Sequence, residues 1–337
     1  MSGPPAPDAG EWLSVYLFFT GWIYAPECDQ IVVEVVEPFV RRCQREGWID
    51  QHFFIRYSEK GPHVRLRLHG DPGVLRETVW PALLEDVRAH SGEVGTETPE
   101  DLRPPYFTAG QPLRVSHVVQ VPYEPEIERY GGPHAIYVAE RMFQVSSDTA
   151  YALLQKMGRE RSSRLGKGLL TMVVLIHLFN RTRDRGSRFA QVYGVSYLRT
   201  VERDEDSRGA KLEAFGAGFD QQAETLGTYV DDVWERMDEG EELSETLDRY
   251  HDGLRVCHDE LRTLCDEGRV ILGGEPVTDW DRVVMSIVPS YTHMMNNRLG
   301  VTLQEESYLS YLITRALGRP AEELMAMAQA APTPPAS

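Results

Sequence analysis

The chain has 337 residues, 42% of them apolar and 26% charged, which is enough to bury a large core. Lys and Arg number 35 against 52 Asp and Glu, and the net charge of −17 argues against non-specific binding to nucleic acid. A mean hydropathy of −0.37 argues against a membrane span. The N-terminus lacks the basic and apolar regions of a signal peptide, so we expect a cytoplasmic protein.

The first 122 residues alternate between strand and helix patterns. Strand segments are rich in aromatic and β-branched residues, and the helical segments place apolar residues at a period near 3.6. The expected elements are a strand at 12–20, a helix from an N-cap at Asp29 to Gly47, strands at 53–57 and 64–68, a helix that opens at Asp71 and extends through Val87, a loop at 91–112 and a strand at 115–121. This β-α-β-β-α-β order predicts a ferredoxin-like antiparallel sheet with its helices on one face.

The rest of the chain is mostly helical in pattern. After a loop rich in Gly and Pro, the expected helices are 135–157, 168–179, 210–237, 241–267, 279–298 with a kink or break at Pro289, and one from 304 to 317. The predicted fold class is therefore α+β. We expect a single catalytic domain at 11–320, comprising a ferredoxin-like part (11–122) and a mainly helical part (123–320), between disordered tails at 1–10 and 321–337.

Four cysteines are present, and none has a Cys-x-x-Cys spacing. We expect buried, reduced thiols and no structural zinc site. The sequence also contains no Walker loop, dinucleotide fingerprint or His-Glu-x-x-His motif.

The segment after the turn at 58–62 carries a cationic face. Side chains alternate along a strand, so His63, Arg65 and Arg67 lie on one face and the apolar residues between them on the other. Two guanidiniums about 7 Å apart repel by roughly 2 kcal/mol at an effective dielectric of about 20. Such a face is either solvated or binds an anion, because arginine holds a carboxylate or phosphate bidentately. The alternation alone leaves both readings open.

Four motifs occur in order along almost the whole chain. They are Phe-Phe-Ile-Arg-Tyr at 53–57, Gly-Pro-His-Val-Arg-Leu-Arg-Leu at 61–68, Glu-Arg-Tyr-Gly-Gly at 128–132 and Ser-Tyr-Thr-His-Met-Met-Asn-Asn-Arg-Leu at 290–299. Together they resemble the C-terminal elimination domain of class I lanthipeptide dehydratases and the related thiopeptide biosynthesis proteins.

The resemblance implies an enzyme that acts on a ribosomally made precursor peptide with a leader. The reaction would be β-elimination of glutamate from glutamylated Ser or Thr, leaving dehydroalanine or dehydrobutyrine. The chain is too short for the glutamylation domain of that family, so a separate glutamyl-tRNA-dependent protein is the expected partner.

Two alternatives stay open. One is a thiopeptide pyridine synthase, which joins two dehydroalanines in a formal [4+2] aza-cycloaddition and expels water and the leader. The other is a non-catalytic protein that binds the precursor. The resemblance implies no metal and no organic cofactor, while the charge and hydropathy lead us to expect no directly bound nucleic acid and no membrane; a homodimer remains open. The leader is expected to add as a strand at a sheet edge or to lie in a groove beside the sheet.

Catalytic residues follow from the same resemblance. Arg65 and Arg67 match the paired arginines that hold the leaving glutamate, and Arg129 resembles a further arginine of that site. His293 resembles the family's histidine and can act as base or acid near neutral pH. A structural role inside a buried helix is the alternative for His293.

Four more residues are expected to bind substrate. Arg56 and His63 flank the turn beside the paired arginines, although the strand parity across that turn is open. Ser290 and Tyr291 lie within one helical turn of His293 and are equally compatible with structural hydrogen bonds.

Overall fold

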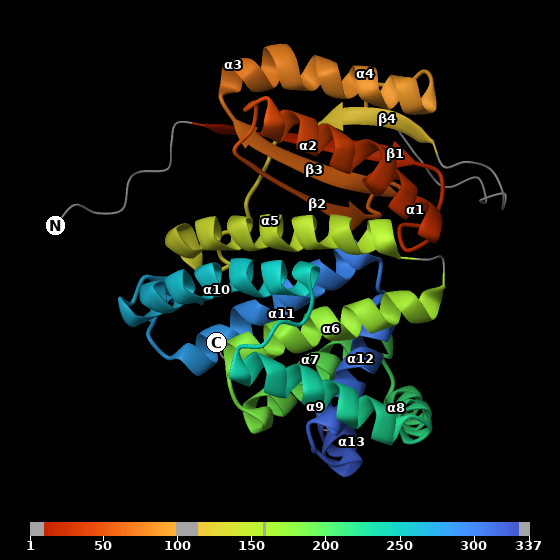
Figure 1. Ribbon diagram of the computed structural model, residues 1–337, viewed down its shortest axis with the longest axis vertical. Coiled ribbons are helices and arrows are strands. Elements are labelled where there is room, and N and C mark those ends of the chain that lie inside the picture. Colours follow the sequence, from red (N-terminus) through yellow and green to blue (C-terminus); the bar gives the residue numbers. More distant parts are fainter. Residues whose placement is uncertain (1–9, 99–113, 158–159, 330–337) are drawn as a thin grey trace. The chain divides into compact units, whose positions relative to one another are not determined.

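The computed structural model describes residues 10–98, 114–157 and 160–329 (Figure 1). Two compact units divide the chain, residues 1–159 and 160–337. The sequence places the change from sheet to helical part at residue 123, whereas the structure keeps helix α5 (Gly132–Lys156) in the first unit. The difference arises because α5 packs against a strand of the sheet.

The first unit is built on a four-stranded sheet. Its strands are β1 (Glu11–Phe19), β2 (Gln51–Tyr57), β3 (His63–Gly70) and β4 (Val115–Gln120). They lie in the order β2-β3-β1-β4, and each neighbouring pair is antiparallel. This order confirms the ferredoxin-like arrangement.

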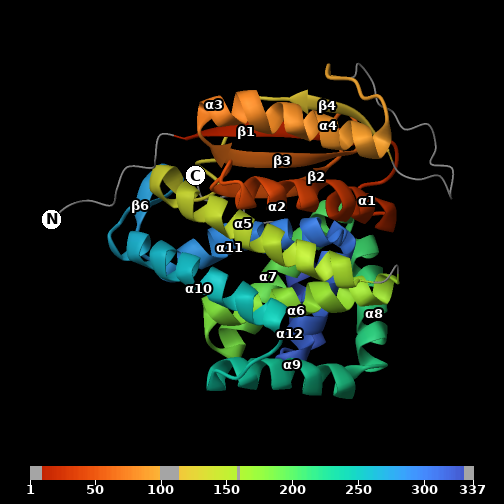
Figure 2. The same cartoon turned by 45° about the horizontal axis from the view of Figure 1, so that its top comes forward.

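Two helical segments cover one face of this sheet, as Figures 1 and 2 show for α2 and α4. Each segment contains a π-helical turn directly before the helix that carries a proline at its first or second position. Proline cannot donate the usual backbone hydrogen bond, and a wider turn accommodates its ring. The segments are α1 (Pro26–Ile31), η1 (Val32–Val36) and α2 (Glu37–Arg45), then α3 (Pro72–Val74), η2 (Leu75–Val79) and α4 (Trp80–Ser91).

The ends of these segments test the expected caps. The Asp71 side chain accepts a hydrogen bond from Val74 N at 2.9 Å, which confirms it as an N-cap. Asp29 was expected to cap the first helix, and this is wrong, because the helix begins at Pro26 and Asp29 lies inside it. Of the expected loop at 91–112, residues 99–113 lie outside the described residues.

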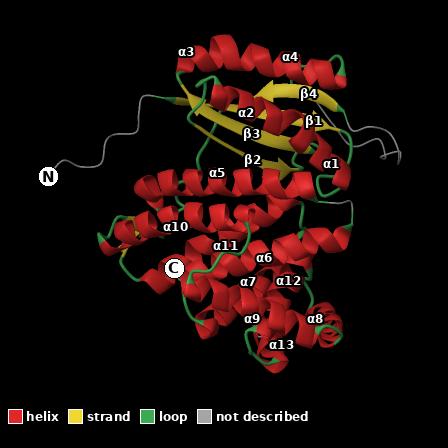
Figure 3. Cartoon of the chain, in the orientation of Figure 1, coloured by secondary structure: helices red, strands yellow, loops and turns green. Residues whose placement is uncertain are grey.

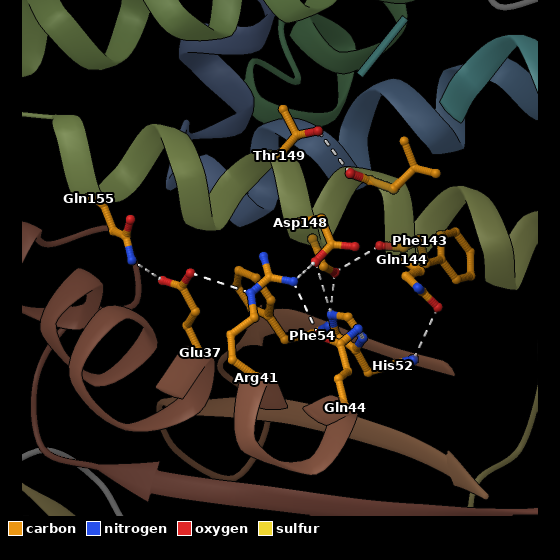
Figure 4. Close-up of polar contacts among 12 residues, drawn as sticks. Glu37, Arg41, Gln44, His52, Phe54, Phe143, Gln144, Asp148, Thr149 and Gln155 are labelled. Carbon is orange, nitrogen blue, oxygen red and sulfur yellow. Dashed lines mark hydrogen bonds and ion pairs between the residues drawn. The ribbon is translucent and has the colours of Figure 1, made fainter. Parts of the chain in front are cut away.

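Helix α5 covers the outer edge of strand β2 (Figure 4). Two backbone N–H groups of that edge donate to α5 side chains: Phe54 N to Ser147 Oγ at 3.2 Å and His52 N to Gln144 Oε1 at 3.3 Å. An uncovered edge strand is a template for pairing with another strand, so this cover removes one edge of the sheet from strand addition.

A polar network also joins α5 to helix α2 in Figure 4. Arg41 Nη1 lies 2.8 Å from Asp148 Oδ1, and Gln155 Nε2 donates to Glu37 Oε2 at 2.6 Å. The helix is thus held to the sheet edge and to the helical layer at once.

Over its described residues, 160–329, the second unit is helical apart from one short hairpin (Figure 3). The expected helix over 210–237 is two helices, interrupted at residues 221–222. Helix α7 and the hairpin were not expected from the sequence. The elements are α6 (Arg161–Asn180), α7 (Arg183–Val201), α8 (Glu205–Asp220), α9 (Ala223–Glu239), α10 (Glu245–Asp266), β5 (Val270–Leu272), β6 (Glu275–Val277), α11 (Trp280–Leu299), α12 (Leu303–Ala316) and α13 (Ala321–Gln329).

Helix α13 corrects the expectation of a disordered tail from residue 321. Leu324 and Ala328 are buried. The guanidinium of Arg199 donates to Met327 O at 2.6 Å, and that of Arg208 donates to Ala328 O at 3.1 Å. These side chains satisfy carbonyls that the end of a helix leaves without a partner. Residues 330–337 and 1–9 lie outside the described residues.

Two further expectations concern single helices. Helix α11 runs continuously through Pro289, so the proline does not break it. Helix α6 is long and apolar enough to cross a membrane by length and composition, but 67% of its apolar window is buried, as in the core helix of a folded protein. All four cysteines are buried and free, as expected, and burial raises the pKa of the Cys43 thiol to about 12.

Candidate active site

Strand β3 carries His63, Arg65, Arg67 and His69 on the sheet face opposite the α2 and α4 layer. The register pairs Arg65 with Tyr16 of β1 and Arg67 with Ser14, so the arginines share their face with these β1 residues. The intervening Val64, Leu66 and Leu68 are buried on the other face. The sequence predicted this partition from alternation alone, and the pairing confirms it.

Arg65 is held by aromatic rings and a histidine. Its guanidinium carbon lies 3.4 Å from the ring centroid of Tyr57 and 4.8 Å from that of Tyr16. Its Nε donates to Nε2 of His63 at 3.1 Å. Stacking of this kind suits a guanidinium and leaves its terminal nitrogens for a ligand. The exposed Glu59 carboxylate, 3.5 Å from Nη2, is the acidic group that competes for them.

Arg67 is a buried cation, with 7% of its surface exposed. Nη1 donates to Leu66 O at 3.3 Å, and the guanidinium lies 5.3 Å and 5.6 Å from the ring centroids of Tyr16 and Tyr123. Among the described residues it forms no ion pair, and its Nε has no hydrogen-bond partner. Burial lowers its pKa below the ordinary value, and Arg65 acts in the same direction. An anion bound against this guanidinium would offset the cost of burying its charge.

His63 positions Arg65 as a neutral ring. Its Nδ1 lies 2.8 Å from Gly61 O, a carbonyl that can only accept, so Nδ1 carries the proton and Nε2 receives the Arg65 hydrogen bond. Burial lowers the His63 pKa to about 4, and the charges of Arg65 and Arg67 add to this. His63, predicted to bind substrate, is fully buried, and its ring contacts Arg65.

Tyr123 closes one side of the arginine face. Its hydroxyl donates to Glu140 Oε1 at 2.8 Å, and its ring lies 5.2 Å from that of Trp12. Glu140 is buried on α5, and burial raises the pKa of its carboxyl. The hydrogen bond fixes the ring that lies against Arg67.

The structure corrects the prediction for Arg56. The register pairs it with Val64, which places it on the face opposite Arg65 and Arg67. Its side chain is fully buried, Nη2 lies 2.6 Å from Asp29 Oδ1, and Nη1 donates to Ile23 O at 3.0 Å. Arg56 therefore stabilises the covered face and does not bind substrate beside the pair.

Arg129 lies in the turn before α5. Its side chain is 41% exposed, and Nη1 lies 2.9 Å from Glu126 Oε2. The adjacent Tyr130 is buried, with its ring 4.9 Å from Phe143 of α5. The turn is thus anchored to the first unit, and Arg129 stands at its surface.

His293 belongs to the second unit, on helix α11. Its Nδ1 lies 2.9 Å from Oε1 of the buried Glu306, and its ring stacks on Tyr197 with centroids 5.3 Å apart. The side chain keeps 18% of its surface exposed, so it is not the fully buried core histidine of the structural alternative. Ser290 and Tyr291, predicted to bind substrate, are both buried on the same helix.

Sequence reasoning missed three residues of these two sites. Tyr16 lies beside the two arginines because β1 pairs with β3, and no local sequence pattern predicts that pairing. Tyr123 is in the loop before α5, and its role depends on the buried Glu140. Glu306 follows the capping box of Thr302 and Glu305, a signal that identifies the start of the helix but not the partner of His293.

The described residues contain no group of three or more His, Cys, Asp or Glu side chains that could hold a metal ion.

Residues 12–317 match the family described as lantibiotic biosynthesis dehydratase C-term. The chain belongs to this family. A curated member, the subtilin biosynthesis protein SpaB of Bacillus subtilis, is 30% identical over 131 residues. That match covers 39% of this chain and 11% of SpaB, so the chain spans a small part of that relative.

Solved structures share the fold at low sequence identity. The pyridine synthase TbtD from thiomuracin biosynthesis has a TM-score of 0.69 at 15% identity and covers 94% of this chain and 99% of its own. TsrL has a TM-score of 0.66 at 18% identity, covering 95% and 98%. The tRNA-dependent lantibiotic dehydratase MibB from Microbispora sp. 107891 has a TM-score of 0.57 at 19% identity, covering 93% of this chain and 28% of MibB.

Proposed function

We propose that the chain eliminates glutamate from glutamylated Ser or Thr side chains of a ribosomal precursor peptide, giving dehydroalanine or dehydrobutyrine. The observation that carries this proposal is Arg67, a buried guanidinium with no ion pair among the described residues, next to a second arginine held by a neutral histidine. In a chain of net charge −17, such a cationic face suits a carboxylate ligand.

The reaction assigns a task to each group. A base removes the α-proton of the modified residue, the electron pair forms the Cα=Cβ bond, and the Cβ–O bond breaks to release glutamate as a carboxylate. Arg67 and Arg65 hold the departing carboxylate, while His293 is the acid–base group. Arg129 is the further cation for the glutamate. A glutamyl-tRNA-dependent protein would supply the modified peptide, in the cytoplasm.

The experiment uses two forms of a precursor peptide, one with glutamyl esters on Ser and one already carrying dehydroalanines. The purified protein, without tRNA or ATP, is expected to release glutamate from the first and leave the second unchanged, as read by mass spectrometry. Arg67→Lys is expected to slow release by about 10²-fold or more, because it loses the planar donor fork. Arg76→Lys, at an exposed arginine whose side chain is 73% accessible, is the matched control.

The second candidate is a pyridine synthase. It is favoured by the overlap with TbtD along nearly the whole of both chains. Loss of the leader from the dehydroalanine peptide with formation of a macrocycle, and no glutamate release from the ester, would select this candidate and reject the first. A protein that binds the precursor without turning over either peptide would be the non-catalytic partner.

A further inference from the structure

A buried carboxylate controls one nitrogen of His293. Glu306 is fully buried, and its Oε1 lies 2.9 Å from His293 Nδ1. No hydrogen-bond partner of His293 Nε2 occurs among the described residues, and the ring is 18% exposed. The two ring nitrogens therefore have different environments, one facing a carboxylate and the other open.

The second oxygen of Glu306 is also occupied. The Tyr193 hydroxyl donates to Oε2. Burial raises the pKa of Tyr193 well above its ordinary value, with the nearby Glu306 charge adding to it, so the phenol keeps its proton and remains a donor. One oxygen of the Glu306 carboxylate accepts the hydrogen bond from Tyr193. The other oxygen can then accept a hydrogen bond from His293 Nδ1–H.

The second unit holds these groups rigidly. Gly194 lets helices α7 and α12 approach closely, because a Cβ at that position would lie 2.6 Å from Ser310 Cβ. Glu306 lies in the first turn of α12, after the capping box at Thr302, where the helix dipole favours a negative charge. Tyr197, from α7, stacks on the imidazole and fixes its plane.

We propose that Glu306 is a positioning residue that fixes the Nε2-unprotonated tautomer of His293, so that Nε2 is the base for the α-proton. This inference rests on the proposed elimination and decides between base and acid for His293. Nε2 takes the proton from Cα, the C–H electron pair forms the double bond, and glutamate leaves with the electrons of the Cβ–O bond. The carboxylate of Glu306 stabilises the imidazolium that forms.

An amide at position 306 would reverse the tautomer. In Glu306→Gln we expect the amide oxygen to keep the hydrogen bond that Glu306 Oε2 accepts from the Tyr193 hydroxyl, so that the amide NH₂ faces His293 and donates to Nδ1. The proton then moves to Nε2, which can no longer accept. We expect glutamate release to fall by at least about 10²-fold; a catalytic histidine held in the wrong tautomer can cost about 10⁴-fold.

Tyr193→Phe provides the rescue. Alone it leaves both carboxylate oxygens in place but removes one hydrogen bond to Glu306, and we expect release to fall by up to about tenfold, less than in Glu306→Gln. Combined with Glu306→Gln it frees the amide to turn its oxygen toward Nδ1–H, and release should recover at least about tenfold from the Glu306→Gln value. Two variants serve as controls: Tyr308→Phe, on helix α12 with Glu306, for the loss of a phenol, and Glu323→Gln, on α13, for the loss of a carboxylate. Failure of the double variant to recover would overturn the proposal.

The tautomer is read directly by ¹⁵N NMR of protein labelled at histidine, with His293→Gln identifying the signal. In the wild-type protein near pH 8 we expect an unprotonated Nε2 and a protonated Nδ1, and the reverse in Glu306→Gln. A wild-type spectrum with the proton on Nε2 would overturn the proposal, and so would a loss of activity in Glu306→Gln without a change of tautomer. The wild-type spectrum needs no variant, so the test stands even if a variant does not fold.

The two proposals fail in different ways. The expected tautomer without release of glutamate from the ester peptide contradicts the elimination and leaves the role of Glu306 in orienting the ring supported. Release of glutamate with the opposite tautomer supports the elimination and overturns the assignment of Nε2 as base.

Discussion

Arg56 and Arg67 are both buried arginines on adjacent strands, yet they lie on opposite faces of the sheet. Arg56 pairs with Asp29 and donates to a backbone carbonyl, so its charge is compensated within the first unit. Arg67 has aromatic rings and one carbonyl around it but no ion pair among the described residues. Burial alone therefore does not distinguish the two arginines; the internal counter-charge does, and its absence at Arg67 is what makes that residue the candidate for binding an anion.

The largest expected effect compares the two arginines directly. Arg56→Met leaves the Asp29 carboxylate without its guanidinium and should lower the free energy of unfolding by about 3–5 kcal/mol. Arg67→Met removes a buried charge that has no ion pair, and should leave that free energy within about 1 kcal/mol of wild type or raise it. Urea denaturation measures both. Equal destabilisation by the two variants would show that Arg67 is a structural cation like Arg56.

The second prediction concerns His63, which accepts a hydrogen bond from Arg65. Its pKa is about 4 in the folded protein and about 6.5 in the unfolded chain, so the unfolded chain binds the additional proton between these values. The free energy of unfolding should therefore fall by about 3 kcal/mol as the pH drops from about 6.5 to 4.

The measurement is a series of urea titrations from pH 4 to pH 7. His63→Gln keeps a hydrogen-bonding side chain but cannot titrate, so the difference in its stability from wild type should vary over this range by that amount. A parallel pH dependence of the two proteins would show that His63 is protonated in the folded state.

The smallest expected change in stability is that of Tyr123→Phe. Tyr123→Phe keeps the ring against Arg67 but removes the hydroxyl bound to Glu140, and should destabilise the fold by about 1 kcal/mol. Binding of free glutamate, followed by calorimetry, should change by less than about threefold. Tyr123→Leu removes the ring and should weaken glutamate binding more. If Tyr123→Phe weakens glutamate binding as much as Tyr123→Leu does, the hydroxyl and not the ring supports Arg67 in binding.

The sequence determined much of this protein because its strongest signals are local. Strand alternation placed Arg65 and Arg67 together on one face, and the order of strands and helices predicted the ferredoxin-like sheet. The apolar period located most helices within a few residues. The four motifs identified the family, which the match over residues 12–317 confirms.

Tertiary structure decided the contacts that join distant parts of the chain. The turn at 58–62 sets the parity between two strands, and with Lys60 and Gly61 at positive φ it placed Arg56 on the covered face. Pairing between helices brought Glu306 to His293, and packing ordered α13 beyond residue 320. Local patterns fix which way a side chain points on its own element, but a counter-charge or a tautomer depends on a partner that only the folded chain brings near.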